Sequence, residues 1–168
     1  MLYLKKANYE DIEEEFNFMS KMKSANGFEN PYINISRNEF KEKCLDEIIG
    51  QSNGNNLPEG YVPNTYFYLW DDNKIVGLFK IRHYLNEHLK NGSGHIGYGI
   101  LEEHRGKGYA TKGLALAIEE CKKIIPEDEI YLRVDKSNFA SLKVMLKNGG
   151  YIHHEDEKKY YVRIKKEN

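Results

Sequence analysis

The sequence is poor in residues and patterns that mark several specialised classes of protein. It has only two cysteines among 168 residues, Cys44 and Cys121, and they do not form the paired spacing of a metal site. We therefore predict no bound metal and no disulfide framework. A reduced, cytoplasmic environment is the simplest expectation.

Long apolar runs and an excess of one charge are also missing. No run approaches the roughly 20 apolar residues of a membrane helix, and the first residues lack the apolar core of a secretory signal. The 25 basic and 26 acidic residues nearly cancel, so no overall charge attracts nucleic acid or an anionic membrane. We expect neither nucleic acid nor a membrane as a partner.

The composition that remains fits a globular protein. Hydrophobic residues make up 40% of the chain and aromatic residues 12%, and no linker or internal repeat divides it. A chain of this length can bury roughly two-thirds of its unfolded surface. We therefore predict a single domain over residues 1–168.

The spacing of apolar residues predicts a mixed α/β fold. Ser36 and Glu39 have the spacing of a capping box, and Gly50 is expected to end the helix that they begin. The residues Asp71-Asp72-Asn73 are typical of a hairpin turn between two strands. The predicted strands cover about 2–4, 65–70, 74–84, 96–100, 130–135, 151–153 and 158–164. The predicted helices cover about 8–23, 36–50, a segment from 109, and a segment that ends before 148.

The stretch from Gly94 to Glu120 organises the rest of the chain. A strand at 96–100 is followed by a turn with Gly106 and Gly108, and helical spacing of apolar residues begins at Tyr109. Glycines remove the Cβ atoms that would keep a ligand away from the backbone. The unpaired N–H groups of a helix start, with Lys107 and Lys112 nearby, suit a phosphate or diphosphate.

Two other phosphate-binding motifs fit this stretch less well. A P-loop requires two glycines with four residues between them, followed by Lys and Ser or Thr, and this order is not present. The dinucleotide fingerprint matches at Gly106 and Gly108, but Thr111 replaces its third glycine. The chain after Lys136 is also too short to complete a doubly wound sheet.

The motif resembles the cofactor loop of the GCN5-related N-acetyltransferase (GNAT) family. That family has Arg or Gln, then two residues, Gly, one residue, and Gly or Ala, and Arg105, Gly108 and Ala110 occupy these places. The following strand leads to Asn138, which matches the family's coenzyme A contact. The resemblance implies a central mixed, mostly antiparallel sheet of six to seven strands flanked by about four helices.

The resemblance also implies acetyl-coenzyme A as cosubstrate and names the residues that would bind it. The amides of the loop would hold the diphosphate, and a backbone N–H near Ile100 or Leu101 would bind the oxyanion that forms at the thioester. The expected cofactor-binding residues are Ile100, Leu101, Arg105, Gly106, Lys107, Gly108, Tyr109, Ala110 and Asn138.

Two side chains are candidates for catalysis. A lysine-like amine acceptor is mostly protonated at neutral pH because its pKa is about 10.4, so a base or a water chain is required. His95 precedes the Ile-Gly-Tyr strand and has a suitable ordinary pKa, although a strand histidine is also commonly structural. Ser141 matches a serine of the branch that acetylates protein N-termini, and Met145 stands where many members carry a tyrosine that protonates the leaving sulfur.

The function implied is transfer of acetyl from acetyl-coenzyme A to a primary amine of a small molecule or a protein N-terminus. The missing tyrosine leaves a non-catalytic acyl-coenzyme A sensor as the alternative. The acceptor depends on the first helices and on the irregular stretch 51–64, where Tyr61 is a candidate contact, as are Arg82 and His83 at the end of a strand. The oligomeric state is open, with a homodimer as one option.

Overall fold

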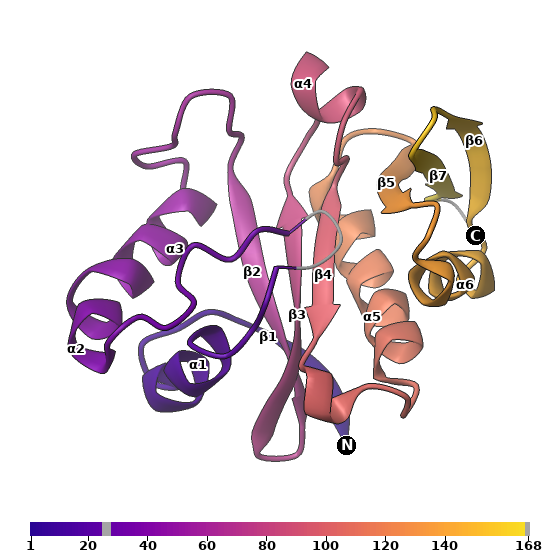
Figure 1. The fold of residues 1–168 in the computed structure, drawn as a ribbon. Coiled ribbons are helices and arrows are strands. Elements are labelled where there is room, and N and C mark those ends of the chain that lie inside the picture. Colours follow the sequence, from indigo (N-terminus) through magenta and orange to yellow (C-terminus); the bar gives the residue numbers. More distant parts are fainter. Residues whose placement is uncertain (25–27, 167–168) are drawn as a thin grey trace.

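The computed structural model describes residues 1–24 and 28–166, which form an α/β fold with seven strands. A four-stranded antiparallel sheet has the order β1-β2-β3-β4, and a three-stranded antiparallel sheet has the order β5-β7-β6. The seven strands and the α/β class confirm the prediction, but the sheet opens between β4 and β5 (Figure 1). The strands are β1 (Leu2–Lys6), β2 (Asn64–Asp71), β3 (Lys74–Arg82), β4 (Ile96–Ile100), β5 (Glu129–Asp135), β6 (Tyr151–Glu155) and β7 (Lys159–Lys165).

Helices cover both faces of the larger sheet. On one face lie α1 (Ile12–Met19), α2 (Arg37–Glu39), the π-helical turn η1 (Phe40–Cys44) and α3 (Leu45–Ser52). On the other face lies α5 (Tyr109–Ile124), as Figure 1 shows. Shorter elements are α4 (Glu87–Lys90), the 3-10 turn η2 (Glu102–His104) and α6 (Phe139–Lys147).

The strand β2 separates two hydrophobic cores because its side chains alternate between the faces. Tyr66, Tyr68 and Trp70 belong to the core beneath α1 to α3. Phe67 and Leu69 belong to the core beneath α5. Such a strand, buried on both faces, has the continuous apolar and aromatic character that its sequence shows.

The first helix is shorter than predicted. It begins at Ile12 rather than Asn8, because the Asn8 side chain accepts a hydrogen bond from the Asp11 N–H at 3.0 Å and forms a turn before the helix. After the helix, the Asn30 side chain donates to the carbonyl oxygen of Met19 at 2.8 Å. The spacing of apolar residues does not reveal such polar side-chain contacts, so it does not show where the helix begins and ends.

The second helical segment confirms the predicted cap. The Ser36 side chain accepts from the Glu39 N–H at 3.2 Å. Gly50 does not end the segment, because α3 continues to Ser52. Among the described residues, no helix is both long and apolar enough to cross a bilayer.

Candidate active site

The two sheets meet at one point, between the start of β4 and β5. The His95 N–H donates to the Tyr131 carbonyl oxygen at 2.7 Å, and the Tyr131 N–H donates to His95 Nδ1 at 2.9 Å. Gly94 fits closely here, because an added Cβ would lie 2.2 Å from the same carbonyl oxygen. Beyond this point β4 pairs with β3 and β5 pairs with β7, so the strands part and leave an opening between them.

A cavity of about 1020 Å³ occupies this opening and extends along both sheets. Its walls include Tyr98, Gly99 and Ile100 from β4, and Arg133 and Val134 from β5. The glycine loop and the first residues of α5 and α6 line one part of the cavity. Residues at the open end of the β2–β3 hairpin, away from its turn, line another part. A cavity of this size and position, between the C-terminal parts of two strands, can hold an extended cofactor beside a small acceptor.

The register of β4 decides which of its backbone groups face the opening. The Leu101 N–H donates to the Val76 carbonyl oxygen of β3 at 3.0 Å, so it is not available to a ligand. Because backbone groups alternate in an antiparallel strand, the N–H groups of Tyr98 and Ile100 point the other way, toward β5. The expectation for Leu101 is therefore not supported, while Ile100 lies in the cavity wall as expected.

The loop after β4 presents a bare backbone. Gly106 has a φ of 78° and Gly108 a φ of 83°, and an added Cβ at either would meet no described heavy atom within 4 Å. No side chain of the described residues caps the start of α5 at Gly108. The first N–H groups of α5 and its positive dipole end are therefore open to an anion in the cavity.

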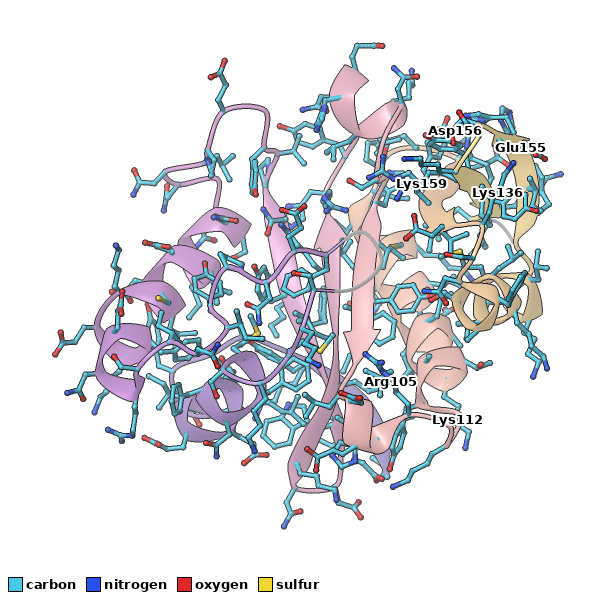
Figure 2. The ribbon with its side chains drawn as sticks, viewed as in Figure 1. Arg105, Lys112, Lys136, Glu155, Asp156 and Lys159 are labelled. Carbon is cyan, nitrogen blue, oxygen red and sulfur yellow. The ribbon has the colours of Figure 1, made fainter. Side chains whose placement is uncertain are left out.

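The other residues predicted for this loop take different places. The Arg105 side chain donates from Nε to the Ile100 carbonyl oxygen at 3.0 Å and so fixes the loop to the edge of β4. Figure 2 shows Arg105 and Lys112 near the start of α5. Tyr109 lines the cavity as expected, and its hydroxyl donates to Asp71. Lys107 is exposed and, among the described residues, not part of the cavity wall.

Asn138 and Ser141 lie together at the start of α6. The Asn138 side chain accepts from the Ser141 N–H at 3.1 Å, which caps the helix, and both residues line the cavity. The Ser141 Oγ lies 3.5 Å from the hydroxyl of Tyr98 on β4. The two hydroxyls therefore span the opening between the sheets. Met145 is 1% exposed and packs in the core, so it supplies no donor here.

Tyr98 was not predicted as a site residue. Its ring stacks on Phe79 with centroids 5.1 Å apart, and it is 3% exposed. Burial raises the pKa of its hydroxyl to about 12, so the group keeps its proton at neutral pH. The sequence showed this residue only as one apolar position of a strand.

His95 does not have the geometry of a general base. It is fully buried and, among the described residues, is not part of the cavity wall. Its Nδ1 accepts from the Tyr131 N–H, so its proton lies on Nε2 and is donated to Glu127 Oε1 at 2.9 Å. Burial lowers its pKa despite the nearby carboxylate. We therefore correct the expectation: His95 joins the sheets and has no ring nitrogen left for an acceptor.

The far part of the cavity carries cations that the sequence analysis mostly missed. Tyr61 and Arg82, both candidates for acceptor contacts, line the cavity. The third candidate, His83, instead hydrogen-bonds through its ring to Thr65 Oγ1 at 2.7 Å. Lys80, which was not considered, also lines the cavity and is only 7% exposed. The available signal was a lysine between Phe79 and Ile81 in a strand that is buried on both faces.

Ion pairs hold the end of β5 beside the cavity. Figure 2 shows Lys136, Glu155, Asp156 and Lys159 gathered near the turn between β6 and β7. Lys136 pairs with Glu155 at 2.6 Å, and Lys159 pairs with Asp135 of β5. These surface pairs individually stabilise little, but together they fix the turn against β5.

Comparisons with known proteins give one family. The chain matches the family model described as acetyltransferase (GNAT) domain over residues 1–150. A comparison with curated proteins gave no match.

Solved structures of low sequence identity share the fold. A ribosomal-protein-S5-alanine acetyltransferase from Vibrio fischeri is 14% identical, with a TM-score of 0.71, and the match covers 99% of this chain and 94% of that one. A ribosomal L7/L12 α-N-protein acetyltransferase in complex with coenzyme A is 16% identical, with a TM-score of 0.69 and coverage of 98% and 94%. A chimera of the spermidine N-acetyltransferase of Vibrio cholerae is 19% identical, with a TM-score of 0.65 and coverage of 98% and 95%.

The family model covers most of the chain. The matched range includes the open glycine loop, the start of α5, and the strands β4 and β5 that part from each other. The chain belongs to the GNAT family of acetyltransferases.

Proposed function

We propose that the cavity binds acetyl-coenzyme A and that the enzyme transfers its acetyl group to a primary amine of a small molecule or a protein N-terminus. The observation that carries this proposal is the open loop from Gly106 to the start of α5. The family uses this cosubstrate, and one of the similar structures holds coenzyme A. The residues present fit the diphosphate, because an added Cβ at either loop glycine would occupy open space.

Each part of the cavity has a role in this proposal. The amides of Gly106, Gly108 and Ala110 would hold the diphosphate, and Arg105 would keep the loop against β4. When bound, the cosubstrate supplies an acetyl group activated as a thioester. The Tyr98 and Ile100 N–H groups face the opening, where a donor can stabilise negative charge on the carbonyl oxygen.

The hydroxyls of Tyr98 and Ser141 are the proposed proton source for the departing sulfur. They lie 3.5 Å apart across the opening, and burial keeps Tyr98 protonated. Protonation need only be partial, because a thiol pKa of about 8.5 already makes a thiolate a fair leaving group. Asn138 would hold Ser141 in place, because its side chain caps the start of α6 by accepting from the Ser141 N–H.

No side chain is assigned as the base in this proposal. His95 is occupied on both nitrogens, so the acceptor would lose its proton to water in the cavity. This arrangement favours acceptors with amine pKa values below that of a lysine side chain, such as an α-amino group with a pKa of about 8.

Thiol release from acetyl-coenzyme A in the presence of a panel of amines tests the proposal. We expect release that depends on the amine, with one acetylated product for each thiol. Tight binding of coenzyme A without any turnover would instead favour the sensor, the alternative that the missing tyrosine had suggested.

A further inference from the structure

Lys80 lies on the inner wall of the cavity, on the face of β3 that carries α1 to α3. Its Cα partners are Tyr66 of β2 and Gly97 of β4, so it stands in the middle of the sheet. The side chain is 7% exposed and lines the cavity. A lysine so far from solvent is unusual, because its charge loses hydration unless a partner replaces it.

No such partner is present among the described residues. The Lys80 ammonium has no ion pair with a described carboxylate, and its contacts there are the rings of Tyr61 at 5.0 Å and Tyr66 at 5.8 Å. The charge of Glu29 acts on it only from a distance and raises its pKa slightly against the larger effect of burial. Burial, and then the charge of Arg82, lower the pKa of Lys80 to about 7. The protein therefore keeps a cation in a position that disfavours its charged form.

Positive charges of neighbouring residues further disfavour the charged form of Lys80. Arg82 lies two residues along β3, on the same face as Lys80, and both line the cavity. Arg133 of β5 also lines the cavity. Burial lowers the pKa of Arg82, and the charge of Arg133 lowers it further. The positive charges come from different strands and face the same volume, which suits an anion.

The carboxylates of the cavity wall offset the positive charge of this inner region only in part, because the charge of Glu29 raises the pKa of Lys80 by less than burial and Arg82 lower it. Glu29 and Glu59 are exposed, and Asp135 is paired with Lys159. A polyamine would bring further positive charge toward Lys80 and Arg82, at a Coulombic cost. The interior of the cavity therefore disfavours a polycation and favours a ligand with negative charge.

We propose that Lys80 and Arg82 bind an anionic group on the acceptor, so that the acceptor is a small amine that carries its own carboxylate or phosphate. This inference rests on the proposed acetyl transfer. Gly97, the partner of Lys80, is one residue from Tyr98 and three from Ile100, which corresponds to roughly 3 to 10 Å along the strand. This distance is within the reach of a small acceptor.

Binding of matched amines tests this inference without turnover. Wild-type protein, with and without coenzyme A, is titrated calorimetrically with phosphoethanolamine against ethanolamine, with an α-amino acid against its amide, and with spermidine. We expect an anionic member of a pair to bind at least tenfold more tightly than its neutral twin. The pair with the larger ratio of affinities shows whether the site prefers a phosphate or a carboxylate.

Two variants attribute the preference to Lys80. Lys80→Gln removes the charge and should bring the ratio of affinities for the anionic and neutral members of a pair close to one. Lys80→Arg keeps the charge and should retain most of the preference for the anionic member. Coenzyme A affinity should be unchanged in both, because Lys80 lies on β3 outside the glycine loop. Equal binding within both pairs, tighter binding of spermidine, or an unchanged ratio in Lys80→Gln would each overturn the inference.

Failure of the proposed function would look different. It would appear as wild-type protein that does not bind coenzyme A or release thiol with any amine. The anion preference is measured in the absence of coenzyme A as well, so each proposal is judged by its own result.

Discussion

The His95 Nδ1 accepts a hydrogen bond from the Tyr131 N–H at 2.9 Å, so a side chain takes part in joining the two sheets where β4 and β5 meet. The same ring donates from Nε2 to Glu127, whose other carboxylate oxygen accepts from the Leu85 N–H at 2.9 Å. The position of β5 relative to β4, and with it the width of the cavity mouth, depends on this imidazole.

His95→Ala should therefore reduce stability first. It leaves the Tyr131 N–H and Glu127 without their partner, and we expect a loss of roughly 2–4 kcal/mol in urea unfolding. His95→Gln, which offers an acceptor and a donor, should recover part of this loss. A base would instead change the pH profile of kcat/KM, and a profile that loses its acid limb in His95→Gln at normal stability would contradict the structural role.

The pH dependence of unfolding gives a second test of the same residue. Burial lowers the pKa of His95 below its ordinary value of 6.5, so the unfolded chain binds more protons below that pH. Stability from this group is present above pH 6.5 and is lost as the pH falls below it. His95→Gln should show a shallower loss than wild type over this range in chemical unfolding.

Glu15 predicts a pH dependence of the opposite sign. It is 0% exposed, one oxygen accepts from the Asn8 N–H at 3.0 Å, and the other has no described partner. Burial raises its pKa from 4.5 to about 8, so the folded protein binds more protons between these values. Stability from this group is present below pH 4.5 and decreases as the pH rises to about 8.

Glu15→Gln should therefore stabilise the protein at pH 7, by roughly 2 kcal/mol, and change little near pH 4.5. The glutamine can still accept from the Asn8 N–H. The exposed Glu10→Gln serves as the control and should change stability little at either pH. A destabilised Glu15→Gln at pH 7 would mean that the carboxylate is charged and held by partners.

Lys80→Met should raise the stability of the protein without ligand. It replaces a buried cation that has no ion-pair partner in the described part of the chain by an apolar side chain of similar length, and we expect a gain of about 1 kcal/mol or more, or ~2–4 °C in Tm. The lowered pKa, about 7 against 10.5 when unfolded, makes wild-type stability rise with pH between these values. The variant should lack that rise in thermal unfolding, and a lower Tm at pH 7 would show that the cation has a partner.

Ser141→Ala and Tyr98→Phe should lower kcat more than they change KM for acetyl-coenzyme A. Each removes one hydroxyl of the pair that spans the opening, and we expect about 10-fold or more in kcat. The double variant should lose little beyond the larger single effect, because the hydroxyls act as one unit. Unchanged kcat in both single variants would assign protonation of the sulfur to water.

The sequence predicted the elements whose information is local. The capping box at Ser36, the hairpin at Asp72 and the glycine turn before Tyr109 each depend on residues within a few positions, and the structure contains all three. The family resemblance added the place of the cofactor loop. Local pattern and motif thus sufficed for the fold class and for locating the glycine loop that lines the cavity.

The rest depends on contacts between distant segments. Whether His95 faces a ligand or Glu127 is decided by a partner 32 residues away, and the pairing of the Leu101 N–H with β3 follows from register. The burial of Lys80 depends on Tyr61 and Tyr66 of other segments. No periodicity within a single strand contains this information.

The affinity of coenzyme A for a glycine variant tests the central claim most directly. Asparagine tolerates positive φ better than other side chains, so Gly108→Asn adds bulk at the loop with little backbone strain. Gly149→Asn is the matched control, since Gly149 has a φ of 87° and equally open surroundings among the described residues, outside the cavity wall. In calorimetric titration we predict that Gly108→Asn weakens coenzyme A binding at least tenfold while Gly149→Asn binds like wild type, and equal affinity in all three proteins would contradict the account.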